Sequence, residues 1–307
     1  MSEARRVFLR RMDSLRIGLG SEAASQLAPR EIDHNSVASL FRQGMAVVGF
    51  VALEDFIKKR ATEALETISQ CGIPFHRLPE KLRRATTHEA LNSISFQIKI
   101  RDGSARELYA QEAAEAIFST KNENYLLYKH AFGYDSSNIN SESVSKILSS
   151  FSISSGWNKM TTLSANLDLG LDLLTRFNSC AQLRHRAAHV PEANIAVGDL
   201  ESLWKDCMAI AISFDAFVER SVSSFQRRDY QVLDGTTAVE ASDIHYTKIK
   251  YFEGHWKLFR KGSVRAIKKC ASLSEMNDYI SGKRWDVPSL HVFYDETRFA
   301  SSWRVTN

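Results

Sequence analysis

A long apolar stripe beginning near residue 200 constrains the fold more than any other feature. Apolar side chains recur there at three- and four-residue spacing, the period of an α-helix, over roughly seven turns. A helix of that length, opening at Asp199, has to bury its stripe against other helices, so the chain is predicted to be mainly α. The stripe consists of Leu200, Leu203, Trp204, Cys207, Ile210, Ala211, Phe214, Phe217, Val218 and Phe225.

A second helical pattern, over residues 161–189, ends in an arginine and a histidine five residues apart. Arg184 shares one face with apolar residues, whereas His189 stands where Pro191 disfavours further helix. The two side chains are therefore expected to face one another across a small gap. Arginine stabilises phosphate charge through its planar fork of donors, and histidine moves a proton near neutral pH, so the pair suits RNA self-cleavage. The apolar residues of that face are Leu173, Phe177, Cys180 and Ala187.

The spacing alone is weak evidence, because a chain of this composition is expected to contain such a pair by chance. Arg83 and His88 repeat the same spacing. There Arg84 follows the arginine, and neither a proline nor a long apolar helix comes after the histidine. We interpret the earlier pair as a solvated helix face and favour the later one.

The later motif and its two helices resemble the HEPN family. The family motif is an arginine, a polar residue, a short spacer and a histidine, here Arg184, His185 and His189. The run 187–189 and the helix before it resemble the RiboL-PSP-HEPN branch in particular, and the resemblance is best over about 35–70 and 160–228. It implies a HEPN-like helical bundle that acts as a homodimer, with two motifs facing a shared cleft.

The resemblance also implies a reaction, namely metal-independent RNA cleavage without a cofactor. His189 would assist proton transfer while the 2′-hydroxyl attacks phosphorus, Arg184 would stabilise the phosphoryl charge, and His185 would orient groups in the dimer site. The products would be a 2′,3′-cyclic phosphate and a 5′-hydroxyl. Arg186 either binds substrate phosphate or, as we favour, reaches solvent. A tyrosine two residues past the histidine marks a branch controlled by a nucleotidyltransferase, but position 191 is proline here.

Families of this kind often serve as toxins or antiphage defence effectors, which implies RNA as substrate and an antitoxin or defence-system partner. Two alternatives stay open. One is a catalytically silent HEPN-like scaffold that binds RNA or protein. The other is a coincidental motif in which Arg184 caps a helix C-terminus and His189 is a surface residue.

A third long helix is predicted from a cap at Asn35-Ser36 to about residue 70. Nearly every position from Met45 to Leu53 is apolar, so this helix should be buried on a second side, by another helix or another subunit. Glu54 either forms a surface pair one turn along the helix or orients Arg184; we favour the surface pair. The inner face is predicted to hold Val37, Leu40, Phe41, Met45, Val48, Ala52, Phe56 and Ile57.

The segments between the long helices carry shorter patterns. Residues 3–17 and 141–151 should be short helices, and 104–131 a longer one. Residues 93–100 alternate with period two and fit a strand or an irregular connector. Residues 152–159 read as a connection.

The last part of the chain changes character, which predicts a helical domain over 1–235 and a small basic α+β module over 240–307. Strands are expected at 244–252, 256–260, 264–267 and 290–294, with a helix at 272–280. Residues 241–307 hold 12 lysines and arginines against 7 aspartates and glutamates. Lys257, Arg260, Lys261 and Arg265, interleaved with aromatic residues, would bind RNA, although a solvated hairpin is slightly favoured.

Composition and cysteine usage suit a reduced, cytoplasmic protein. The sequence shows neither an apolar run long enough to span a bilayer nor the pattern of a secretory signal. The four cysteines are far apart and lack metal-ligand spacing, so no metal site is predicted. Cys180 and Cys207 fall on apolar stripes and should be buried free thiols.

Overall fold

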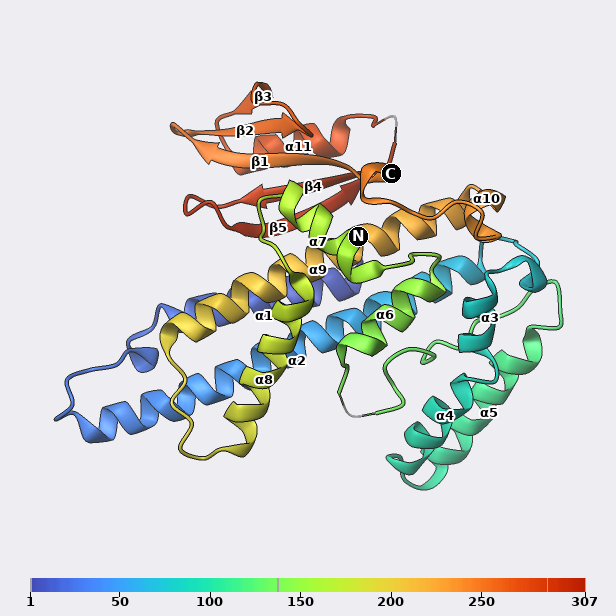
Figure 1. Cartoon of the computed structure of the whole chain (residues 1–307), viewed down its shortest axis with the longest axis horizontal. Helices are drawn as coiled ribbons and strands as arrows, with labels where there is room; N and C mark the ends of the chain where they lie inside the picture. The colour runs from blue at the N-terminus through green and yellow to red at the C-terminus, as the bar shows by residue number, and fades with distance from the viewer. Residues whose placement is uncertain (1, 137, 286, 307) are drawn as a thin grey trace.

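The computed structural model describes residues 2–136, 138–285 and 287–306, and it confirms a mainly helical chain with a small C-terminal sheet. Helices α2 (Ile32–Ser69) and α9 (Val197–Gln226) lie side by side at its centre (Figure 1). They run parallel, because Arg42 at the start of α2 reaches Ile195 just before α9, and Arg60 further along α2 reaches Asp215. The apolar stripe of α9 is buried as predicted.

Two further helices flank this central pair. Helix α1 (Glu3–Leu19) runs antiparallel to α2, since Ala4 contacts Glu63 and Arg11 contacts Asp55. Helix α8 (Leu173–His189) packs on both α2 and α9, and Phe177 meets Phe50 with ring centroids 5.4 Å apart. The four helices bury one continuous apolar core.

A buried carboxylate on α9 joins the helices to the sheet. Asp215 is fully buried and accepts from Arg5 of α1 at 2.7 Å, from Arg60 of α2 at 2.6 Å and from the Trp303 indole at 2.6 Å. Burial by itself would raise the pKa of Asp215, but the two guanidinium groups outweigh it and lower the pKa to about 2. The ring of Trp303 packs against both Phe8 and Phe56, which also contact each other.

The C-terminal sheet has the strand order β3-β2-β1-β4-β5, with β1 and β4 parallel and the other neighbours antiparallel. One face joins the helical core through Tyr246, Val292 and Trp303, and α11 (Leu273–Gly282) covers the other. The division at 235–240 stays a prediction, although apolar contacts cross it. The strands are β1 (His245–Phe252), β2 (His255–Arg260), β3 (Ala266–Cys270), β4 (Ser289–Tyr294) and β5 (Ala300–Thr306).

The prediction missed β5 altogether and placed β3 too early. The polar alternation of residues 300–306 gave little signal, yet its Trp303 is one of the largest buried side chains. Residues 262–265 form the turn before β3, where Gly262 has φ +71°.

Smaller helices complete the fold. Helices α3 (Glu80–Thr86), α4 (Ala90–Lys99) and α5 (Gly103–Ser119) form an arm that projects from one end of the central pair (Figure 1). Helices α6 (Ser141–Ser150) and α7 (Gly156–Asn166) lead back to α8. Short turns of helix occur at η1 (Glu22–Ala24), η2 (Phe75–Arg77), α10 (Tyr230–Leu233) and η3 (Ala241–Asp243).

Predictions for four segments were wrong. Residues 161–189 are not one helix, because Asp168, Gly170 and Asp172 adopt positive φ and separate α7 from α8. In addition, α7 begins at Gly156, inside the connection predicted over residues 152–159. The segment 93–100 lies mostly in helix α4, which buries Ala90, Ser93 and Gln97 at helical spacing. The helix predicted over 104–131 ends at Ser119.

Helix α2 also departs from its prediction. Asn35 does not cap it; the helix begins at Ile32, and the Asn35 side chain bonds Leu27 and Ala28. Of the predicted inner face, Met45, Ala52, Phe56 and Ile57 are buried. The other four face outward, with Val37, Leu40, Phe41 and Val48 exposed by 64, 70, 41 and 58%.

Together with Gly44 and Val51, these outward residues form a stripe along α2, which we call the α2 outer stripe. By length and composition α2 is the one helix in the described residues that could cross a membrane. Half of its most apolar window is buried within the fold.

The Asp215 cluster gives a first prediction. Asp215→Asn leaves two buried arginines without their shared charge and should lower the free energy of unfolding by about 3–5 kcal/mol. Because the pKa of Asp215 is lower in the folded chain than its ordinary 3.8, its stabilisation is complete above about pH 4 and lost as the pH falls towards about 2. Urea unfolding of both chains at several pH values measures this. Equal stability of the two chains would contradict the account.

Candidate functional site

Arg184 occupies the half-buried face of α8, as its place on the apolar stripe predicts. Its Nη2 donates to Asn138 Oδ1 at 3.2 Å, and its buried Nε has no hydrogen-bond partner among the described residues. Asn138 belongs to the loop between α5 and α6. The guanidinium is thus held at one corner and keeps donors available for a ligand.

His185 and His189 lie on a different side of the same helix. They are one turn apart and exposed, and their ring centroids are 4.6 Å apart. Because α8 continues through His189, the five residues from Arg184 turn the side chain by about 140° around the helix axis. Within the described chain no hydrogen bond joins Arg184 to His189. The two side chains do not meet across a gap inside one chain.

Glu54 is not a surface residue. It is 5% exposed, and its Oε1 accepts from the Ile139 N–H at 2.7 Å. Burial raises the pKa of Glu54, and the Ile139 N–H, Lys58 and the positive charge of Arg184 oppose that rise only in part. The surface pair belongs instead to Asp55, which binds Lys59 at 3.0 Å. Glu54 therefore supports the loop that holds Arg184, next to Asn138.

Arg186 forms an ion pair with the start of the next long helix. It lies 3.5 Å from Asp199 at the start of α9, and both side chains are about half exposed. This surface pairing agrees with the solvent position that we favoured for Arg186.

The basic residues of the C-terminal module are dispersed. Lys257 binds Glu253 at 2.7 Å, and Lys261 donates to the Ser242 carbonyl at 3.2 Å. Arg260 and Arg265 are exposed near the β2–β3 turn. Their role in binding RNA stays a prediction. Lys248 and Lys250, two further lysines of the module on β1, both bind Asp168 of the α7–α8 linker.

The competing pair lies at the end of α3. Arg83 Nε donates to the Leu78 carbonyl at 3.0 Å, and His88 is exposed beyond the last turn of that helix. The arginine is therefore used locally, and the histidine faces solvent.

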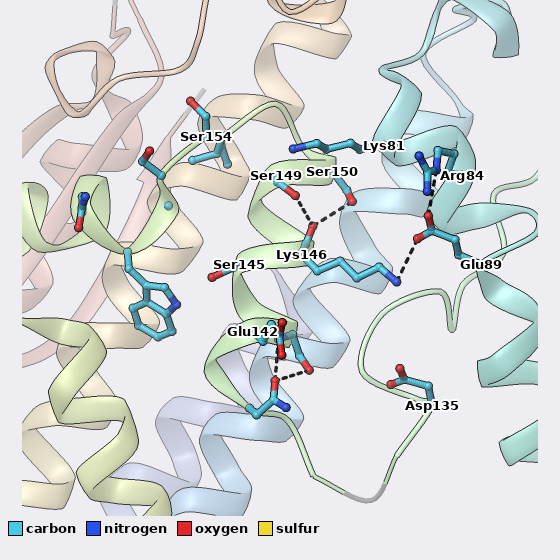
Figure 2. Close-up of a pocket in the computed structure, with 17 residues that line it drawn as sticks. Lys81, Arg84, Glu89, Asp135, Glu142, Ser145, Lys146, Ser149, Ser150 and Ser154 are labelled. Carbon is cyan, nitrogen blue, oxygen red and sulfur yellow. Dashed lines mark hydrogen bonds and ion pairs between the residues drawn. The ribbon is translucent and has the colours of Figure 1, made fainter.

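A cavity of about 860 Å³ lies away from this motif. Figure 2 shows its wall between α3, α6 and the start of α7, with serines along α6. Its cations are largely neutralised, because Glu89 binds both Arg84 and Lys146 at 3.0 Å. Neither Arg184 nor His189 lines it. Sequence reasoning did not identify this cavity, since a serine-rich helix carries no specific signal.

A smaller groove of about 560 Å³ lies directly beyond the motif. Pro191 and Asn194, which follow His189, form one side, and the first turns of α2 form the other. Gln43 of α2 fixes the turn after the motif by donating to the Pro191 and Ala193 carbonyls at 3.1 and 2.8 Å. No sequence pattern predicts this groove, because its parts are far apart along the chain.

Comparison with known proteins decides the family. The model of the RiboL-PSP-HEPN family matches residues 30–220, from the start of α2 into the last turns of α9. The chain belongs to the RiboL-PSP-HEPN family. The match contains Arg184, His185 and His189, and lies outside α1 and the C-terminal sheet. No curated protein and no solved structure matches the chain. Membership in a HEPN family suggests a role in RNA cleavage or RNA binding.

The support that Glu54 gives to the loop can be measured. Glu54→Ala leaves the buried Ile139 N–H without an acceptor and should lower the free energy of unfolding by about 1–3 kcal/mol. Glu54→Gln keeps an oxygen there and should lose less. Asp55→Ala, which removes only exposed ion pairs, is the matched control and should cost about 0–1 kcal/mol. Urea unfolding compares the three. An equal loss from Glu54→Gln and Glu54→Ala would refute the supporting role of that oxygen.

Proposed function

We propose that the chain is a metal-independent endoribonuclease. The observation that carries the proposal is the HEPN motif of a HEPN-family chain, Arg184 to His189, at the exposed end of a well-anchored helix. Arginine and histidine supply the charge and the proton transfer that RNA cleavage requires.

The proposed step is attack of the ribose 2′-oxygen on the adjacent phosphorus. The 2′-hydroxyl loses its proton to a histidine, the P–O5′ bond breaks, and the departing 5′-oxygen takes up a proton. The products are a 2′,3′-cyclic phosphate and a 5′-hydroxyl, and no water is consumed. His189 takes part in the proton transfer, and Arg184 stabilises the negative charge on the non-bridging phosphoryl oxygens. His185, 4.6 Å from His189 between ring centroids, orients its partner.

A second copy of the chain would complete this site. Arg184 and His189 diverge around α8, so one chain presents them in different directions. The α2 outer stripe exposes apolar side chains over several turns, and Gln43 beside it holds the turn that follows His189. Pairing of two such stripes about a two-fold axis would bury them and bring both α8 ends into one cleft. We therefore propose a homodimer in which Arg184 of one subunit acts with His189 of the other.

The biological role follows as a further proposal. An endoribonuclease of this family, located in the cytoplasm, would act as a toxin or antiphage defence effector and would need an antitoxin or a defence-system partner to restrain it.

The direct test is cleavage of a mixed RNA pool in EDTA. The native chain should cut and leave cyclic-phosphate ends, and His189→Ala and Arg184→Ala should each lose at least about a hundredfold in rate. His88→Ala, the same change at the competing pair, should cut normally. Cutting that survives His189→Ala would refute the mechanism. RNA binding without any cutting would instead support a silent HEPN scaffold.

The dimer has its own test. Val48→Asp places a charge on the α2 outer stripe and should make the chain monomeric and inactive. Burying that unpaired charge in the dimer interface would cost on the order of several kcal/mol. Leu108→Asp on α5 is a matched control, since Leu108 is exposed by the same 58% as Val48. Light scattering coupled to size exclusion gives the mass of each variant. A native monomer that cuts RNA would rule the dimer out.

A further inference from the structure

The groove beyond His189 contains a buried positive charge without a carboxylate partner. Arg42 is 2% exposed and lines the groove. It donates to the Ile195 carbonyl at 2.6 Å, to the Ala24 carbonyl at 2.9 Å and to Gln26 Oε1 at 3.3 Å. No aspartate or glutamate lies within ion-pair distance of it in the part of the chain that the structure describes.

The other buried arginines of the core behave differently. Arg5 and Arg60 both reach Asp215, and Arg60 also binds Glu219. Neutral acceptors satisfy hydrogen bonds but leave the unit charge of Arg42 uncompensated. Because a charge acts more strongly when it is shielded from water, the groove should carry a positive potential. An anion that enters the groove would supply the counter-charge that Arg42 lacks within the protein.

The rest of the wall suits a nucleotide. Gln26, Ser39 and Asn194 line the groove with amide and hydroxyl groups, and Gln26 and Asn194 are exposed. Amide side chains form paired hydrogen bonds with base edges, and unpaired RNA leaves those edges accessible. The groove begins two residues after His189, at Pro191, so it adjoins the motif.

We infer that this groove binds the RNA strand beside the scissile bond. The electrostatic field of Arg42 attracts the phosphate that flanks the cut, and the amides of Gln26 and Asn194 contact its base. This inference rests on the proposed function for its link to cleavage, but its binding claim can be tested without cleavage. Single-stranded RNA is the ligand, because only an unpaired strand presents a phosphate and a free base edge together.

Gln26→Glu is the decisive variant. Its carboxylate would stand where Gln26 Oε1 already accepts from Arg42, so it would supply the missing counter-charge. The fold should become no less stable, whereas binding of a short single-stranded 2′-O-methyl oligoribonucleotide should weaken about tenfold, with a smaller dependence on salt. The probe cannot be cut because its 2′-oxygens are blocked. Because the fold should be no less stable, loss of folding cannot explain the weaker binding.

Two companions complete the experiment. Asn194→Asp adds the same charge at the groove rim and should also weaken binding. Asn158→Asp, an exposed position on α7 outside the groove, is the matched control and should leave binding unchanged.

Fluorescence anisotropy measures affinity, and thermal unfolding measures stability. Unchanged affinity in Gln26→Glu, or an equal loss in Asn158→Asp, would overturn the inference. Gln26-sensitive binding by a chain that never cuts RNA would reject the nuclease and keep the groove.

Discussion

The fold depends on one buried carboxylate. Asp215 sits in the middle of the apolar stripe of α9 and receives hydrogen bonds from α1, α2 and β5. An isolated buried charge would be costly, so the two guanidinium groups and the indole have to be in place for the core to close. This requirement fixes the mutual positions of three helices and the edge strand of the sheet.

That arrangement determines where the motif stands. With α2 and α9 parallel, α8 crosses between the loop before α9 and the middle of α2, and its last turn emerges beside the start of α2. Asn138, on the loop that Glu54 supports, then holds Arg184 against the core side, while His185 and His189 face solvent. The same geometry forms the Arg42 groove immediately after the histidine. The motif, the α2 outer stripe and the Arg42 groove are therefore neighbours at one end of α8.

The long helices could be predicted because their apolar residues repeat at the helical period, and stripes such as Leu200 to Phe225 carry that signal plainly. The motif could be predicted because it stands where such a pattern ends, just before Pro191. Prediction from the sequence failed where tertiary context decides. Residues 93–100 alternate as a strand does, yet pack as a helix, and Val37, Leu40 and Val48 continue an apolar stripe that this chain alone does not bury. Asp215 did carry a readable signal, a lone carboxylate in an apolar run, which predicts buried cationic partners. Arg42 carried none, since its missing partner is evident only once distant loops have closed around it.

The central claim is that two subunits share each site, and mixing two inactive variants tests it most directly. Arg184→Ala and His189→Ala dimers would be allowed to exchange subunits before cleavage is assayed in EDTA. If Arg184 acts with His189 of the other subunit, each mixed dimer holds one complete site, and random exchange should restore about a quarter of native activity. If the two residues act within one chain, every site stays incomplete. No recovery of cleavage, with exchange verified by mass, would contradict the account.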